Sequence, residues 1–357
     1  MSSRGLLFVW CFLLVFFHYG LSAQSRKGDL ENIARHRRVY SGPPVISSLD
    51  GFTGSVSDSL LSRIGSWVLT EDVDVEEHSS GSSDIVLPDS SVSVAFVEGI
   101  DPEVMLSVCP DFVSSVSSFI TLNSEGLSRA LGRFAFYRER FLDVFVSYGI
   151  PEDIALLSVV ESALKIDAVS HAGAAGIWQL MPYTAGDYGL ECSLRIDERM
   201  DIDRSTVAAA RYLRDAYRRL GSWQLAVTAY NCGCECVERA VVMAGGSRDF
   251  WDIRQFLPAE TRAYTPAFNA VVMAWHFSDI YGIDVLPYDP GVVEFRIDWD
   301  MPFRQLEAAT GISFEEFISC NPQYLSGYVP GAERVRFLRL PRRYARLYRD
   351  NIRVVDF

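Results

Sequence analysis

Four short segments of this chain carry side chains that suit the cleavage of a glycosidic bond. The segments are Glu-Ser at 161–162, Gly-Ile-Trp-Gln-Leu-Met-Pro at 176–182, Ala-Tyr-Asn at 229–231 and Glu-Thr-Arg-Ala-Tyr at 260–264. In the first, Glu161 follows an apolar run, and the others add amides, hydroxyls and aromatic rings. A carboxylic acid in such surroundings can protonate a leaving oxygen and later take a proton back. The four segments therefore predict an acid–base site for a carbohydrate.

Glu161 is the candidate acid of this site. Val159 and Val160 precede it, and Ala163 and Leu164 follow Ser162. In a partly dry cleft the charged form of a carboxyl group is disfavoured, which raises its pKa and keeps it protonated near neutral pH. Taken alone, an acid in apolar sequence is more often a capped structural group than a functional one. The neighbouring segments favour the functional role.

The segments after Glu161 supply candidates for binding a sugar. The loop at 170–176 consists largely of small residues, which let the backbone approach a ligand closely. Gln179 has both donors and an acceptor, which suits an N-acetyl group, and Met181 has an apolar face for a pyranose ring. Trp178 offers a similar face, or it belongs to the core. The candidate substrate-binding residues are Ser162, Gln179, Met181, Tyr230, Asn231 and Tyr264.

Two of these candidates have plain structural alternatives. Asn231 follows Tyr230 at an expected helix boundary, where its side chain could instead cap the helix. Tyr264 either points its phenol into the cleft or closes the core.

Hydrophobic periodicity predicts that helices position these residues. We expect helices at 133–148, from Pro151 through Glu161, at 203–220, from Leu225 past Tyr230, and at 266–281. Pro151 suits a first helical turn, and Gly221 suits a helix end. The core is therefore expected to be all-α.

A strand-helix-helix-strand pattern follows the expected helices. Residues 292–297 and 334–340 alternate as strands do, and 303–310 and 313–320 read as short helices between them. This pattern predicts a separate small α+β module.

The N-terminal region reads as a targeting signal and a leader. Residues 6–17 form an unbroken apolar run after Arg4, too short to span a bilayer comfortably, and small residues before Gln24 suit a cleavage site. An uncleaved anchor is the alternative. The stretch from Gln24 to about 100 is rich in Ser, Gly and acids, which predicts a flexible leader. We expect an exported protein of the periplasm or cell envelope, with membrane association left open but no transmembrane helix in the mature chain.

Charge and composition exclude several partners. The formal net charge of −13 disfavours nucleic acid, because an acidic chain repels a phosphate backbone. The cysteines at 232, 234 and 236 lack the second Cys or His pair that zinc patterns require, so we expect no metal and no cofactor. Export permits disulfides, for example from this cluster to Cys192, and unpaired thiols are the alternative.

The stretch from about 149 to 281 resembles the family-one lytic transglycosylases of the membrane-bound D type, which share a fold with goose-type lysozyme. Glu161-Ser162 matches the family's catalytic motif, and 176–179, 229–231 and 260–264 match its other three motifs in order. The resemblance implies a lysozyme-like helical catalytic domain, with Glu161 as its one acid and base. A departure follows Asn231, where relatives usually have a Gly-Pro-Gly turn and this chain has Cys232-Gly233-Cys234.

The resemblance also implies a reaction. Peptidoglycan would be cleaved between N-acetylmuramic acid (MurNAc) and N-acetylglucosamine (GlcNAc), and the muramoyl 6-hydroxyl would attack to give a 1,6-anhydro end without water. An intramolecular attack needs no second carboxylate. A goose-type hydrolase is the first alternative, with Asp167 or Asp187 as the second acid. A non-catalytic peptidoglycan-binding scaffold, in which Glu161 is idle, is the other.

The C-terminal pattern resembles a degenerate LysM glycan-binding module, in which Trp299-Asp300-Met301 replaces the usual Gly-Asp-Thr. The full set of expected divisions is a signal peptide at 1–23, a leader at 24–100, a helical lead-in at 101–150, a transglycosylase domain at 151–285, a LysM-like module at 291–341 and a tail at 342–357.

Overall fold

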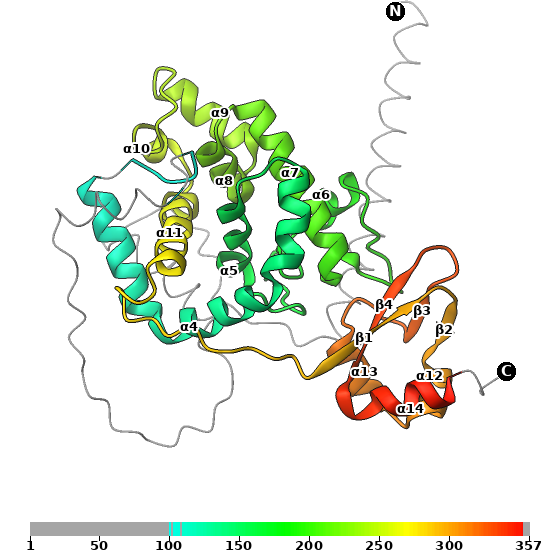
Figure 1. Cartoon of the computed structure of the whole chain (residues 1–357). Coiled ribbons are helices and arrows are strands. Elements are labelled where there is room, and N and C mark those ends of the chain that lie inside the picture. The colour runs from blue at the N-terminus through cyan, green and yellow to red at the C-terminus, as the bar shows by residue number, and fades with distance from the viewer. Residues whose placement is uncertain (1–99, 101–102, 108, 353–357) are drawn as a thin grey trace, which may run out of the picture.

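The computed structural model describes residues 100, 103–107 and 109–352, so the expected signal peptide and almost all of the expected leader lie outside the described residues. The described part is mainly helical, with a small α+β unit at its C-terminal end (Figure 1). The prediction of a mainly α chain is confirmed. None of the described helices is long and apolar enough to cross a membrane.

The helical unit runs from α4 to α11. Its helices are α4 (Pro110–Ser147), η1 (Glu152–Leu156), α5 (Leu157–Ser162), α6 (Pro182–Asp187), η2 (Glu198–Met200), α7 (Ile202–Leu220), α8 (Trp223–Cys232), α9 (Cys234–Met243), α10 (Phe250–Ile253), η3 (Arg254–Phe256) and α11 (Ala259–His276). Figure 1 shows α5 in the middle, with α4, α7, α8 and α11 around it. Because these helices surround α5, nearly all of its side chains are buried. Their packing restricts the position of Glu161 near the end of α5.

The long helix α4 begins 23 residues before the expected start at 133. Its first half contains many serines, which blur the apolar period. Polar residues there donate hydrogen bonds within the helix: Asn123 donates to the carbonyl of Phe119 at 2.7 Å and Ser128 donates to that of Ser124 at 3.0 Å. These bonds within the helix let α4 continue through a stretch that sequence reasoning assigned only to a helical lead-in.

Helix α11 also begins earlier than expected, at Ala259, and carries Pro266 in its interior. A proline removes one backbone donor, which leaves the carbonyl four residues earlier without its helical partner. Here that carbonyl belongs to Arg262, and it accepts a hydrogen bond from Nε of Arg254 at 3.3 Å. This long side chain explains why the helix passes the proline that was expected to start it.

The C-terminal unit has its own small core. Antiparallel β1 (Val292–Ile297) and β4 (Arg336–Pro341) pair from Val292↔Pro341 to Ile297↔Arg336, and β2 (Asp300–Pro302) pairs with β3 (Tyr328–Pro330). Helices α12 (Phe303–Thr310) and α13 (Phe314–Cys320) match the expected ranges closely. Leu306, Phe317 and Leu338 are among the fully buried side chains at its centre.

The expected tail at 342–357 needs correction over its described part. Residues 342–351 form η4 (Arg342–Tyr344) and α14 (Ala345–Asn351), and Tyr348 of α14 belongs to the core of the C-terminal unit. Helix α14 covers one face of β1, where the ring centres of Phe295 and Tyr348 lie 4.4 Å apart. The short, arginine-rich helix gave little apolar signal in the sequence.

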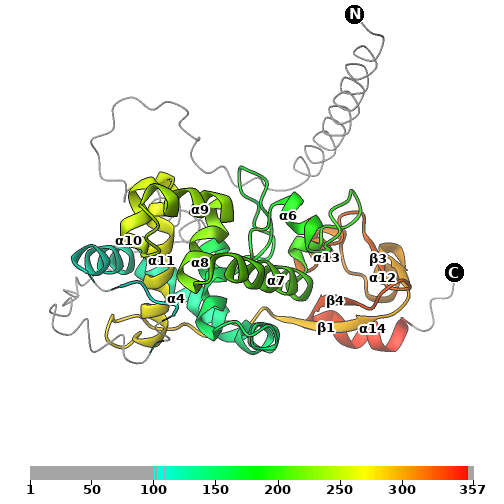
Figure 2. The same ribbon diagram turned by 90° about the horizontal axis from the view of Figure 1, so that it is seen from above.

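The C-terminal unit has a core of its own, as a separate module would, and it also contacts the helical unit. It lies at the end of the helical unit where α6 and α7 are found (Figure 2). Ile196, from the loop before η2, is buried in the core of the C-terminal unit. The linker after α11 packs as well, since the amide of Leu286 donates to the carbonyl of Ser128 in α4 at 3.3 Å.

Candidate active site

Glu161 lies at the end of α5, half-buried, with the backbone after it in an unusual conformation. Ala163 and Leu164 have φ values of 50° and 58°, in the left-handed region that residues with a Cβ atom avoid. Among the described residues, Gln179 at 45° is the one other non-glycine residue with a positive φ. All three are in or beside the segments that sequence analysis selected. Backbone strain of this kind tends to collect at functional sites.

Tyr264 of α11 donates a hydrogen bond from its hydroxyl to Oε1 of Glu161. Burial raises the pKa of Glu161 to about 8, the bond from Tyr264 opposes this rise, and the charge of Glu260 adds to it. Burial, together with the nearby Glu161, also raises the pKa of Tyr264 well above its ordinary value. The pair therefore consists of a protonated acid and a phenol that stays a donor.

Gln179 lies in the tight loop at 163–181 that joins α5 to α6, called the Gln179 loop below. Its amide nitrogen donates to the carbonyl of Ala168 at 3.2 Å and to that of Gly176 at 2.8 Å, which ties the loop together. Its amide oxygen makes no hydrogen bond with the described residues and remains able to accept one. Of the donor and the acceptor expected to bind an N-acetyl group, the side-chain oxygen of Gln179 is the one without a partner among the described residues.

Ser162 is not exposed at the surface of the molecule, whereas its expected contact with substrate would require exposure. The side chain is fully buried, and its hydroxyl donates to the carbonyl of Ile177 at 2.9 Å. Ser162 points inward because it occupies the helix position after Glu161, on a different side of α5. Its bond fastens the Gln179 loop to the helix that carries the acid.

The end of α8 carries Tyr230 and Asn231. The hydroxyl of Tyr230 donates to the carbonyl of Trp178 at 2.8 Å, and burial together with Glu161 raises the pKa of Tyr230 well above its ordinary value. Oδ1 of Asn231 accepts a hydrogen bond from Thr261 at 2.7 Å, which leaves its amide nitrogen open to a ligand. Asn231 does not cap the helix, because the capping position of α8 is Gly233.

Trp178 and Met181 differ in their exposure to solvent. Trp178 is fully buried, stacks on Phe145 at 5.2 Å and donates from its ring nitrogen to Thr206 at 2.9 Å, so it belongs to the core and not to a sugar platform. Met181 stands at the start of α6 with 40% of its surface exposed. Met181 is therefore accessible, as its expected role against a sugar ring requires.

Sequence reasoning missed the residues that hold the Gln179 loop from below. Arg199 of η2 is buried, pairs with Asp197 at 2.9 Å and donates to the carbonyls of Gly173 at 2.6 Å and Leu180 at 3.1 Å. Gly176 sits so close to η2 that a Cβ atom there would lie 1.8 Å from the carbonyl oxygen of Arg199. The one available signal was the Asp-Glu-Arg triplet at 197–199, which is hard to single out because other charged residues lie on both sides of it.

The carboxylates considered as a second acid show no link to Glu161. Asp167 and Asp187 are both exposed, and neither affects the pKa of Glu161, on which Glu260 is the one acting charge. Glu260 lies at the start of α11 and is exposed. A single acid with a phenol donor is therefore the chemical unit that the described geometry offers.

The cysteines are free thiols throughout the described part of the chain, so the pairing suggested for Cys192 is not formed. Cys192 lies beside Asp197 and Arg199, whereas Cys232 lies against Cys236. Among the described residues no group of three or more His, Cys, Asp or Glu side chains could hold a metal ion.

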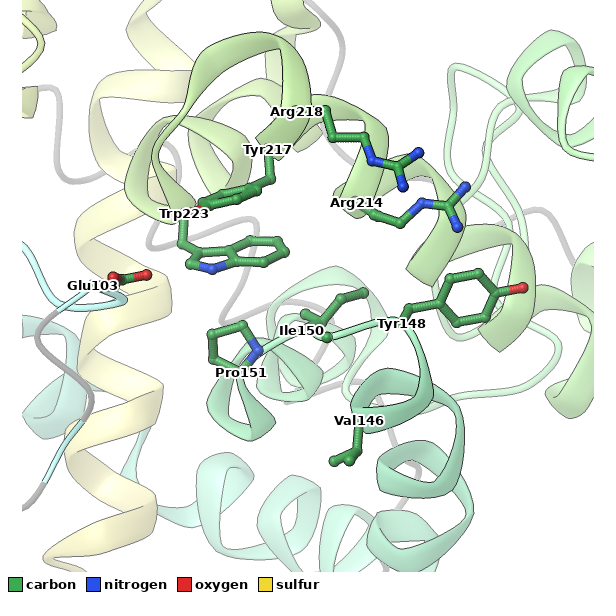
Figure 3. Close-up of a pocket in the computed structure, with 10 residues that line it drawn as sticks. Glu103, Val146, Tyr148, Ile150, Pro151, Arg214, Tyr217, Arg218 and Trp223 are labelled. Atoms are coloured by element: carbon green, nitrogen blue, oxygen red, sulfur yellow. The ribbon is translucent and has the colours of Figure 1, made fainter.

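A pocket of about 590 Å³ lies away from these residues (Figure 3). Pro151 before η1 and Trp223 at the start of α8 line it, whereas Glu161 and Asn231 stand at the far ends of α5 and α8. Tyr217 stacks on Trp223 at 4.1 Å, and the guanidinium of Arg214 lies 5.0 Å from the centre of the Tyr148 ring. None of the expected site residues lines this pocket, so it is a feature distinct from the candidate active site.

Comparisons with known proteins give several matches. The Transglycosylase SLT domain family matches residues 147–251. The chain is 32% identical over 209 residues to the membrane-bound lytic murein transglycosylase D of Escherichia coli (strain K12), a match that covers 57% of this chain and 46% of that protein. It is 29% identical over 117 residues to the membrane-bound lytic murein transglycosylase F of Alteromonas mediterranea, covering 29% of this chain and 24% of that protein.

Among solved structures, the 70 kDa soluble lytic transglycosylase of Escherichia coli aligns with a TM-score of 0.33 and 17% identity, over 77% of this chain and 46% of that one. The chain spans less than half the length of the curated relatives that it matches.

Proposed function

We propose that this chain, whose residues 147–251 match the Transglycosylase SLT domain, is a peptidoglycan lytic transglycosylase. Its substrate would be the β-1,4 bond between MurNAc and GlcNAc, and its product a 1,6-anhydroMurNAc end. The relatives named as lytic murein transglycosylases support the reaction class. The observation that carries the proposal is the half-buried Glu161, with a pKa raised to about 8 and a hydrogen bond from Tyr264.

Glu161 would act in both halves of the reaction. Its proton would go to the glycosidic oxygen as the bond to the GlcNAc leaving group breaks. The carboxylate formed would then take the proton of the muramoyl 6-hydroxyl as that oxygen attacks the anomeric carbon. The donor from Tyr264 stabilises the carboxylate between the two steps, because hydrogen bonding to a charged acid favours its charged form. Atoms balance without water, and the enzyme ends protonated as it began.

The remaining site residues would bind the sugar. The free acceptor of Gln179 and the free donor of Asn231 suit the two ends of an N-acetyl group, and Met181 suits the flat face of a pyranose ring. Ser162, Tyr230 and Tyr264 would act by placing the loop and the acid. We further propose export to the periplasm or cell envelope and a LysM-like role in glycan binding for residues 291–341.

A digest of purified sacculi, analysed by mass spectrometry, tests the proposal. Wild-type protein is expected to release muropeptides lighter by one water than reducing-end products. Glu161→Gln is expected to lower the rate by about 10³-fold, since a positioned acid–base contributes 10² to 10⁴. Asp167→Asn is the matched control, because it removes an exposed carboxylate that is close to Glu161 in the sequence.

The outcomes separate the three candidate functions. Anhydro products that disappear with Glu161→Gln and persist with Asp167→Asn support the transglycosylase. Reducing ends that disappear with both variants indicate a hydrolase. Sacculi that bind without release of any product, from wild type and variants alike, indicate a scaffold.

A further inference from the structure

The loop at 195–199 belongs to two parts of the molecule at once. On one side Ile196 is buried among Leu338, Leu340 and other core residues of the C-terminal unit. The amide of Asp197 donates to the carbonyl of Gln323 at 2.9 Å, next to α13. On the other side residues 198 and 199 begin η2, which carries the side chain of Arg199. A displacement of the C-terminal unit would therefore pull on η2.

Glu198 fastens this loop to β4 with a buried charge. Only 1% of its side chain is exposed, and it pairs with Arg336 of β4, whose side chain is 6% exposed. Arg334 adds a second contact at 3.3 Å, and the amide of Glu191 donates to the other carboxylate oxygen at 2.8 Å. Burial opposes the charge of Glu198, but the amide of Glu191, Arg336 and the nearby Arg204 outweigh it and lower its pKa. A buried charge that loses its partner is strongly destabilised, so Glu198 and Arg336 hold each other in place.

Arg199 passes the constraint on to the Gln179 loop. Its guanidinium is held by Asp197 through two bonds of 2.9 Å, and its remaining nitrogen bonds the carbonyls of Gly173 and Leu180. Those two carbonyls stand on either side of Gln179. The loop in turn receives the hydroxyl of Ser162, the residue after Glu161. Polar contacts and the backbone between them thus connect β4 to the helix that carries Glu161.

A second connection fixes the orientation of the C-terminal unit. Arg140 of α4 pairs with Asp203 of α7 and, at 3.0 Å, with Glu294 of β1. Arg339 of β4 bonds the same Glu294 at 2.8 Å. The unit is therefore held at two separate places, once against η2 and once against α4 and α7.

We propose that the C-terminal unit is a positioning part of the candidate active site, which acts on the Gln179 loop through Ile196, Glu198 and Arg199. The first role of the C-terminal unit is then to hold the Gln179 loop in place, whether or not the unit also binds glycan. The activity readout below rests on the proposed transglycosylase function, whereas the exchange readout does not.

Hydrogen exchange measured by mass spectrometry on the full chain tests the proposal directly. Ile196→Ala and Arg336→Gln are expected to raise amide exchange in peptides covering 173–181 by about tenfold, since the amides of Gly176, Gln179 and Leu180 bond within this loop. Peptides from α7 and α8 are expected to keep their protection. Ile312→Ala is the matched control, because Ile312 is equally buried in the same core but stands between α12 and α13 and not in the loop that leads to Arg199.

Turnover of sacculi gives the second readout. Arg336→Gln is expected to lower kcat about tenfold with a smaller change in KM, because misplacement of the loop disturbs the acid more than the open binding surface. Arg336→Lys, which keeps the charge, is expected to recover part of the loss. Ile312→Ala is expected to retain wild-type kcat at a temperature where it is folded.

The results separate this proposal from the proposed function. Unchanged exchange in 173–181 for both Ile196→Ala and Arg336→Gln would overturn it, even if wild type is active. Equal effects of Ile196→Ala and Ile312→Ala would also overturn it, since they would reflect lost stability alone. If Arg336→Gln does not fold, Ile196→Ala and its control still decide. A wild type that forms no anhydro product contradicts the transglycosylase while the exchange result stands.

Discussion

Glu161 keeps its proton near neutral pH because burial acts on its carboxyl group more strongly than the hydrogen bond from Tyr264. A general acid works best when its pKa lies near the working pH, so a value of about 8 leaves most molecules ready to donate at pH 7. The phenol then matters after proton transfer, when the carboxylate needs a donor. Glu161 thus supplies the acid, and Tyr264 stabilises the carboxylate that later acts as the base.

The pH dependence of kcat/KM follows from this balance. Activity requires the protonated acid, so we expect kcat/KM to fall as the pH rises through about 8. Tyr264→Phe removes the bond that lowers the pKa of Glu161, and the alkaline limb should therefore move to higher pH while kcat drops. Tyr183→Phe, an exposed phenol on α6, serves as the control and should leave the limb in place. A limb that moves down in Tyr264→Phe would contradict the assigned role of the phenol.

The raised pKa of Glu161 should also make the protein less stable as the pH rises, in the same direction as the loss of activity. The pKa of Glu161 is raised from 4.5 to about 8 on folding, so the folded state binds the extra proton and loses stability as the pH rises across that window. Glu161→Gln lacks this loss. Its free energy of unfolding should exceed that of wild type by on the order of 3 kcal/mol more at pH 9 than at pH 4.5. Urea unfolding at both pH values measures the difference, and a difference independent of pH would contradict the raised pKa.

Among the structural elements, the Gln179 loop depends most on close backbone packing. Gly176 faces the carbonyl of Arg199 with no room for a Cβ atom, whereas Gly173, also at a positive φ, has nothing within 4 Å of such an atom.

Gly176→Ala should therefore cost about 3 kcal/mol or more of unfolding free energy, because both the clash and the left-handed backbone oppose it. Gly173→Ala should cost about 1 kcal/mol, from its backbone conformation alone. Thermal unfolding of the two variants measures the contrast. Similar values for both would mean that η2 moves aside easily.

The sequence foretold the helices wherever apolar residues recur without interruption, as at 203–220 against the observed Ile202–Leu220. It did not foretell the first half of α4, where serines blur the apolar period, or the first turns of α11, where the carbonyl freed by Pro266 is bonded by the side chain of Arg254. The same limit applies to the site. The chemistry of Glu161 could be predicted from residue type, whereas the support from Arg199 depends on contacts about twenty residues away.

At the scale of the whole molecule, α14 completes the C-terminal unit. Tyr348 is 4% exposed, and its hydroxyl is buried with no hydrogen-bond partner in the described part of the chain. A buried hydroxyl without a partner is destabilising, and removing it can be favourable.

Tyr348→Phe should thus unfold at the same temperature as wild type or higher, with a gain of up to about 1 kcal/mol. Tyr348→Ala should lose about 3 kcal/mol through the cavity left in the core. Leu347→Ala, a neighbour that is 44% exposed, is the control and should change little. Calorimetry of the three variants tests the ranking, and a marked loss in Tyr348→Phe would show that the hydroxyl has a partner after all.

The burial of Ile196 in the C-terminal core bears on how this chain could be recombined with others. A crossover placed in the linker at 283–291 would divide the protein at its natural sequence boundary, yet it would leave Ile196 behind with the helical unit. The fragment that carries a complete core is discontinuous: it comprises 292–351 together with the loop at 195–198. Chimaeras that exchange only the continuous segment should therefore assemble poorly unless residue 196 of the recipient fits the incoming core. The residues that form the C-terminal core are therefore not one continuous segment of the chain.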